Sequence, residues 1–181
     1  MPGRSLWSLQ SDSSLETPDR FTIRSMTVED LEQVVAIDQL SFSLPWPAHS
    51  FRYELLENDV SRQWVVEMQS SSGAPKVIGM IVVWLIMDEA HIATIAVHPE
   101  YRGRGIGRQI LLTALRECAA QGALSATLEV RERNAIAVDM YRKLGFEVVG
   151  LRKRYYQDTN EDAILMTLET QELKSITSLT G

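Results

Sequence analysis

The residues best suited to chemistry lie in a glycine-rich segment, residues 98–108. An apolar run ends just before this segment at Val97, and a helical pattern of apolar residues begins inside it at Ile106. Glycine lets the backbone approach a ligand closely and point several N–H groups at it. A helix N-terminus adds partial positive charge and arginines add full charges, which suits a pyrophosphate group. The glycines of the segment are Gly103, Gly105 and Gly107, and its arginines are Arg102, Arg104 and Arg108.

Two common nucleotide-binding loops do not fit this segment. A Walker A loop ends in Gly-Lys-Ser/Thr, whereas an arginine and a glutamine follow Gly107. A dinucleotide-binding fingerprint that begins at Gly103 needs a glycine at position 108, where this chain has an arginine. The pattern that does fit is Arg-x-x-Gly-x-Gly, which begins at Arg102.

A second motif, Asn-x-x-Ala-x-x-x-Tyr-x-x-Leu-Gly-Phe, begins at Asn134. Together with the loop and the Ile-Ala-Val strand before it, this motif resembles the GNAT superfamily of N-acetyltransferases, which bind acetyl-CoA. The resemblance covers roughly residues 21–169. It implies acetyl-CoA as cosubstrate, and it assigns cosubstrate binding to Ile95, Ala96, Val97, Arg102, Gly103, Arg104, Gly105, Ile106, Gly107, Arg108, Asn134 and Tyr141.

Amide formation from a thioester requires a base for the amine, donors for the oxyanion and an acid for the leaving thiolate. Asn134 and Tyr141 are seven residues apart, so two helical turns place them on one face. The resemblance implies that Asn134 binds the CoA arm, that Tyr141 is the general acid and that a backbone N–H near Val97 binds the oxyanion. A phenol with a pKa of about 10 is protonated at neutral pH, as an acid must be. The alternative for Tyr141 is an aromatic residue that packs on the sheet.

Glu129 is the candidate for the base. It lies on a predicted strand between Leu128 and Val130, which share one face, so Glu129 points to the other face. A carboxylate there is able to take the amine proton, directly or through water. The alternative is a solvated or arginine-paired glutamate. An α-amine has a pKa of about 8 and a lysine about 10.4, so deprotonating a lysine costs about 3 kcal/mol more.

Three further segments narrow the class of acceptor. They are Ser-Phe-x-x-Pro-Trp from Ser41, Leu-Glu-Val-Arg-x-x-Asn from Leu128, and Arg-Tyr-Tyr from Arg154 with Glu-Asp-Ala-Ile-Leu-Met after it. They resemble the bacterial ribosomal-protein N-alpha-acetyltransferases (RimI type), which implies transfer to the N-terminal alanine of small-subunit ribosomal protein 18. The residues that this resemblance places beside the peptide are Pro45, Trp46, Tyr155 and Tyr156.

Other acceptors and roles stay open. Trp46 is equally well explained as a core anchor. A lysine side chain, a polyamine or an aminoglycoside is an alternative acceptor, although the double tyrosine and the Pro-Trp loop count against it. A non-catalytic acetyl-CoA-binding module is the alternative of another class, and the presence of both Glu129 and Tyr141 counts against that.

The elements that must position these residues follow the order β-α-α-β-β-β-α-β-α-β-β. Period-two runs predict strands, and apolar residues at i, i+3 and i+4 predict helices. The pattern favours an α/β (α+β) domain with a single mixed, largely antiparallel sheet and helices on both faces, as in the GNAT fold. The predicted strands are residues 21–24, 63–68, 76–87, 90–97, 125–130, 146–150 and 162–168, and the predicted helices are a segment from 27, one around 51–55, 105–121 and 135–144.

Length and composition bound the rest. The 181 residues suit one domain at 21–169, between a flexible N-terminal tail (1–20) and a C-terminal tail (170–181). A net charge of -6 disfavours a general nucleic-acid surface. The single cysteine, Cys118, excludes an intrachain disulfide and is expected to be a buried thiol in a reducing cytoplasm. We expect no membrane segment, no signal peptide, no metal, and a monomer or weak dimer.

Overall fold

The computed structural model describes residues 21–69, 73–169 and 173. The tails expected at 1–20 and 170–181 lie outside these residues except for Leu173, which is buried in the main core. The strands are β1 (Phe21–Ser25), β2 (Ser61–Met68), β3 (Lys76–Ile86), β4 (Glu89–Val97), β5 (Ser125–Arg131), β6 (Glu147–Tyr156) and β7 (Glu161–Leu168). The helices are α1 (Leu31–Ser41), α2 (Ala48–Leu56), α3 (Ile106–Ala120) and α4 (Ala135–Lys143), with 3-10 turns η1 (Val28–Asp30) and η2 (Pro99–Tyr101).

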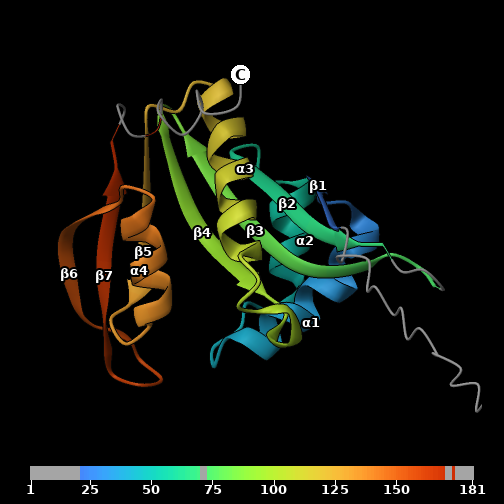
Figure 1. Cartoon of the computed structure of the whole chain (residues 1–181), viewed down its shortest axis with the longest axis horizontal. Coiled ribbons are helices and arrows are strands. Elements are labelled where there is room, and N and C mark those ends of the chain that lie inside the picture. The colour runs from blue at the N-terminus through green and yellow to red at the C-terminus, as the bar shows by residue number, and fades with distance from the viewer. Residues whose placement is uncertain (1–20, 70–72, 170–172, 174–181) are drawn as a thin grey trace, which may run out of the picture.

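The strands form one seven-stranded sheet in the order β1-β2-β3-β4-β5-β7-β6. Every neighbouring pair is antiparallel except β4 and β5, which are parallel. Helices α3 and α4 cover one face of the sheet, and α1 and α2 cover the other (Figure 1). The predicted element order and the predicted mixed sheet with helices on both faces are confirmed.

Each face of the sheet has its own apolar core. On the α3 side, Ile110, Ala114 and Leu115 are buried against strand residues, because apolar residues at i, i+4 and i+5 share one helix face. Cys118 lies in this core, and burial raises the pKa of its thiol to about 11, as expected for an inert structural cysteine. On the other side, α1 contributes Val34 and Ile37 to a second core.

The largest differences from the predicted boundaries are at the first helix and at β6. The helix predicted from residue 27 begins as the short 3-10 turn η1, where the Thr27 and Asp30 capping box is present. Strand β6 continues to Tyr156, whereas the predicted strand ends at residue 150. Because β6 is the exposed edge strand of the sheet, its charged run Arg-Lys-Arg does not need an apolar pattern to pair with β7.

The feature that shapes the centre of the molecule is the separation of β4 from β5. Their parallel pairing covers only Glu89–Ile92 opposite Ser125–Leu128, although both strands continue. Ala93 is an extra residue in β4, because Val83 pairs with Ile92 and Val82 pairs with Thr94. A bulge bends its strand and re-aims the residues that follow. The two strands accordingly diverge toward the end of the sheet where the glycine-rich loop begins (Figure 1).

No helix within the described residues is long and apolar enough to cross a membrane.

Candidate active site

The glycine-rich loop links β4 to the N-terminus of α3. Gly103 and Gly105 both have φ of +76°, a left-handed conformation that favours glycine. A Cβ atom at either position would meet no atom within 4 Å, so the loop backbone is open on that side. A Cβ atom at Gly107 would lie 3.7 Å from Val97 Cγ2 and 3.9 Å from Met140 Sδ, which is ordinary contact.

The first turn of α3 suits an anion. Gly105 is its N-cap and supplies no side-chain acceptor, and the first turn contains no acidic residue. The helical ladder begins with the Gln109 N–H donating to the Gly105 carbonyl at 3.1 Å. The preceding N–H groups therefore have no intrahelical acceptor and are available, with the helix dipole, for a pyrophosphate.

The three arginines of the loop differ in their surroundings. The Arg102 guanidinium donates to the Val97 carbonyl at 2.9 Å and to the Ser41 hydroxyl at 3.0 Å, so it ties the loop to β4 and α1. The Arg104 guanidinium lies 5.3 Å from the centre of the Tyr101 ring. Arg108 is exposed on the first turn of α3. Arg102 thus has an internal structural role in addition to the cosubstrate contact expected from the sequence.

The strand residues expected to contact the cosubstrate follow the bulge. Ile95 and Val97 pack toward the α3 core, whereas Ala96 packs into the α1 and α2 core. Beyond Ile92 the side of β4 that faces β5 has no strand paired to it. The oxyanion donor expected near Val97 would lie on this part of β4.

Glu129 projects from β5 away from the core that holds Leu128 and Val130, as the alternation predicted. Its side chain is 17% exposed. Its Oε2 lies 3.5 Å from His91 Nε2 on β4, and its Oε1 lies 3.5 Å from Arg152 Nη1 on β6. Sequence reasoning missed both partners, because each depends on which strands are neighbours. The sequence did carry one signal for His91: alternation along β4 sends its side chain to the face opposite that of Ala90 and Ile92.

Tyr141 lies on α4 and is 5% exposed, with its ring centre 5.7 Å from that of Phe146. Burial, and then the nearby Tyr156, raise the pKa of Tyr141 above its ordinary value. Its hydroxyl is therefore protonated throughout the physiological range and is available as a donor. At the start of the same helix, Asn134 is exposed and its Oδ1 accepts a hydrogen bond from the Ala137 N–H at 3.3 Å.

The Pro-Trp loop joins α1 to α2. Pro45 is exposed, whereas Trp46 is partly buried, with its ring centre 5.2 Å from Phe51 and 6.5 Å from Trp84. The Trp46 N–H donates to Asp38 Oδ2 at 2.7 Å, which fixes the loop on α1. Trp46 is therefore a packing anchor of this loop, whatever contact it makes with a peptide.

The double tyrosine lies near the end of β6. The Arg131 guanidinium stacks 3.9 Å from the centre of the Tyr156 ring, and Tyr155 is 5.2 Å from Tyr156 and more exposed. Burial raises the pKa of Tyr156 to about 12. Tyr156 also lies within electrostatic range of both Tyr141 and Glu129, so these three expected site residues occupy one region.

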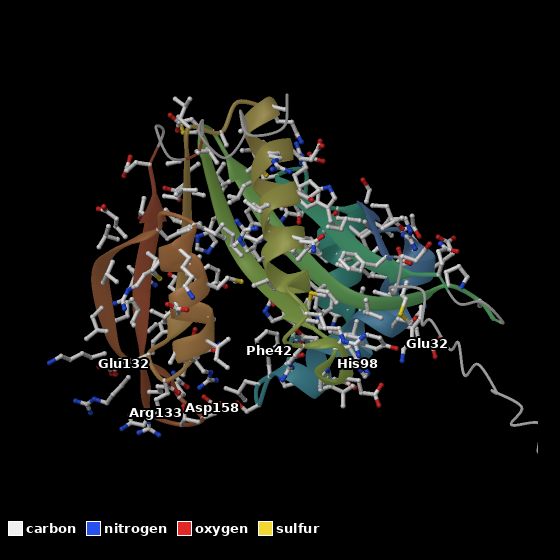
Figure 2. All side chains as sticks on the ribbon, in the orientation of Figure 1. Glu32, Phe42, His98, Glu132, Arg133 and Asp158 are labelled. Atoms are coloured by element: carbon white, nitrogen blue, oxygen red, sulfur yellow. The ribbon has the colours of Figure 1, made fainter. Side chains whose placement is uncertain are left out.

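A polar cluster that the sequence did not reveal joins the two expected peptide-binding segments. The Ser43 hydroxyl donates to Asp158 Oδ2, and Arg131 donates to the same oxygen at 2.8 Å. The hydrogen bond from Ser43, and then the Arg131 guanidinium, lower the pKa of Asp158 to about 2. Phe42, Asp158 and His98 are labelled in the lower part of Figure 2, and hydrogen bonds from Ser43 to Asp158 and from Arg102 to Ser41 join the segments around them.

Comparison with known proteins agrees with this geometry. The Acetyltransferase (GNAT) family matches residues 31–146. A Bacillus subtilis protein, provisionally named as a ribosomal protein bS18-alanine N-acetyltransferase, is 37% identical over 150 residues, covering 83% of this chain and 96% of that protein. The crystal structure of the ribosomal-protein-S18-alanine N-acetyltransferase from Escherichia coli matches with a TM-score of 0.74 at 30% identity, over 83% of this chain and 94% of that one.

A more distant structure shares the fold alone. It is NAA60 of Arabidopsis thaliana in complex with acetyl-CoA, with a TM-score of 0.75 at 18% identity, over 84% of this chain and 99% of that one.

Proposed function

The chain belongs to the GNAT acetyltransferase family and is an acetyl-CoA-dependent N-acetyltransferase, and we propose that its acceptor is the N-terminal amine of a protein, the N-terminal alanine of ribosomal protein bS18. The observation that carries the proposal is the similarity to bS18-alanine N-acetyltransferases over 94–96% of their length. A ribosomal acceptor makes the cytoplasm the site of the reaction.

The cosubstrate fits the loop and the separated strands. Acetyl-CoA supplies the acetyl group as an activated thioester. The α3 N-terminus and the glycine-rich loop would bind its pyrophosphate through backbone N–H groups, with Arg104 and Arg108 adding positive charge. Asn134 at the start of α4 would bind the pantetheine arm. The backbone of β4 past the Ala93 bulge would donate to the oxyanion that develops on the carbonyl oxygen.

Two side chains would handle the protons. Glu129 takes a proton from the attacking amine, and Tyr141 gives a proton to the departing thiolate. Because the pKa of Tyr141 is raised, its hydroxyl is protonated at neutral pH, as a general acid must be. An N-terminal amine, with a pKa of about 8, needs only a modest base such as a carboxylate.

The opening for the peptide would lie between the Pro45 loop and the β6–β7 turn. The Ser43, Asp158 and Arg131 contacts tie these two segments together, which supports a narrow entry. Such an entry favours an extended chain end over a lysine within a folded surface. Pro45 and Tyr155 are exposed beside it, while Trp46 and Tyr156 form its packed base.

Two peptides test the proposal. One begins with a free Ala-Arg-Tyr sequence and contains no lysine, and the other has a blocked N-terminus and one internal lysine. We expect acetylation of the first peptide alone, read by mass spectrometry. Acetylation of the second peptide alone would contradict the proposal and favour a side-chain acetyltransferase. Binding of acetyl-CoA without turnover on peptides, polyamines or other small amines would favour the non-catalytic module.

A further inference from the structure

Four polar side chains form a line across β4 and β5 that ends at Glu129. Glu89 and His91 lie two residues apart on β4, and Thr127 and Glu129 lie two residues apart on β5, so all four occupy one face of the sheet. The parallel pairing sets His91 directly opposite Thr127.

Each of the four side chains contacts the next one along the line. Thr127 Oγ1 donates to Glu89 Oε1 at 3.0 Å, and His91 Nδ1 lies 3.1 Å from Thr127 Oγ1. The other ring nitrogen, His91 Nε2, lies 3.5 Å from Glu129 Oε2. Glu89 is exposed, whereas the side chains of His91 and Glu129 are only 23% and 17% exposed. The line therefore connects a sheltered carboxylate with the surface.

The direction of the hydrogen bonds follows from the donors available. Because the Thr127 hydroxyl uses its only proton on the Glu89 carboxylate, it accepts from His91. His91 must then carry its proton on Nδ1, which leaves the lone pair of Nε2 facing Glu129. The ring is held in this orientation by stacking on Trp84, with ring centres 5.4 Å apart and planes 21° apart.

We propose that His91 is a proton relay for the transferase: it takes the amine proton from Glu129 and passes it through Thr127 to Glu89 at the surface. The inference rests on the proposed function, since it needs Glu129 as the base. The charged groups around the ring are Glu89 on its own strand, Glu129 on β5, and Arg152 on β6, which contacts the other oxygen of Glu129. Strand β3 presents the uncharged Trp84 ring.

The step conserves protons and changes no oxidation state. The amine N–H bond breaks and a Glu129 O–H bond forms. That proton moves to His91 Nε2, the Nδ1 proton moves to Thr127 Oγ1, and the Thr127 proton moves to Glu89, which releases it to water. The 3.5 Å separation between Glu129 and His91 is longer than a formed hydrogen bond, and it would shorten once Glu129 carries a proton to donate.

The test is the steady-state kinetics of three His91 variants on the Ala-Arg-Tyr peptide. His91→Phe keeps a ring against Trp84 and removes both nitrogens, and His91→Gln keeps a hydrogen-bonding group that cannot relay a proton. We expect both to lower kcat by about tenfold or more, less than the ~10²–10⁴-fold that removal of a general base costs, with KM little changed. In His91→Ala, added imidazole should restore turnover in proportion to its unprotonated form.

The exposed His49 on α2 supplies a matched control, and His49→Gln should behave as the unaltered enzyme. Melting temperature and acetyl-CoA affinity show that the variants are folded. A kcat of His91→Phe within about twofold of the unaltered enzyme would overturn the relay. Full activity of His91→Gln, or no rescue of His91→Ala by imidazole, would also overturn the relay. Either result would leave His91 with a packing role alone. Failure of the unaltered enzyme on the peptide would instead contradict the proposed function.

Discussion

At the scale of single residues, the proposed base and the proposed acid have unlike surroundings. Glu129 is partly exposed between His91 and Arg152, whereas Tyr141 is buried beside Phe146 with its pKa raised. A base must be ionised and an acid protonated at the same pH, and these surroundings suit that division.

Replacing either group should remove turnover without removing cosubstrate binding. Glu129→Gln is expected to lower kcat by ~10²–10⁴-fold, because it removes a general base. Tyr141→Phe should lower kcat and keep the fold, since the ring still packs on Phe146. Calorimetric titration with acetyl-CoA provides the control, and unchanged turnover in both variants would contradict the assigned roles.

The buried thiol of Cys118 predicts a loss of stability at high pH. Its pKa is raised from 9.0 to about 11, so above pH ~9 the unfolded chain releases this proton while the folded chain keeps it. The free energy of unfolding should fall by up to about 1.4 kcal/mol per pH unit through this group between pH ~9 and ~11, and the raised pKa values of Tyr141 and Tyr156 add to the fall above pH ~10. Urea unfolding at several pH values measures the slope. The same slope in Cys118→Ala would show that the thiol is not its source.

At this scale the sequence could predict the face of the sheet to which a side chain points. It could not predict which side chains of neighbouring strands that side chain contacts. Alternation along residues 125–131 was enough to orient Glu129. Its contacts with His91 and Arg152 arise from strands 38 and 23 residues away along the chain, and they require the sheet order. The Ser43 and Asp158 contact spans 115 residues, and no local pattern marks it.

At the scale of elements, a turn, a helix end and a bulge would form the proposed binding region. The loop after β4 was recognisable from the spacing of its glycines. The positive φ of Gly103 and Gly105 explains why glycine is needed at these two positions. The Ala93 bulge carries no signal in the sequence, because a bulge depends on the register with β3. The full length of β6 was missed because an exposed edge strand tolerates charges.

Gly105→Ala and Gly107→Ala should distinguish two reasons for glycine in the loop: a backbone with positive φ, and close approach of the pyrophosphate to the backbone. Gly105→Ala places a side chain at positive φ, which should destabilise the fold by about 1–2 kcal/mol. Gly107→Ala meets only ordinary contacts within α3, so stability should be kept or rise by up to ~1 kcal/mol from helix propensity. If the pyrophosphate lies on this turn, both changes should weaken acetyl-CoA binding. Unchanged affinity in a stable Gly107→Ala variant would contradict that placement.

At the scale of the whole molecule, the proposed site lies where β4 and β5 diverge (Figure 1), and the Pro45 loop and the β6–β7 turn would enclose its entry. Two apolar cores, one on each face, hold the sheet that carries Glu129 and His91. The overall fold was predictable, because element order and glycine-rich spacing are properties of the linear chain. The enclosure of the site was not, because it depends on distant side chains such as Arg131 and Asp158.

Loosening that enclosure should affect the peptide and not the cosubstrate. Asp158→Asn removes the charge that holds Ser43 and Arg131, so the Pro45 loop should separate from the β6–β7 turn. We expect a higher KM for the peptide, with the acetyl-CoA affinity unchanged. An unchanged peptide KM would show that the two segments do not form the entry.

The most direct test of the central claim uses intact, unacetylated ribosomal protein bS18 with acetyl-CoA. Fragmentation mass spectrometry then locates each acetyl group, with the Glu129→Gln variant as the control. The account predicts one acetyl group on the N-terminal alanine, formed by the unaltered enzyme and lost or greatly slowed with the variant. Acetyl groups on lysine side chains with a free N-terminus, or equal acetylation by the variant, would contradict it.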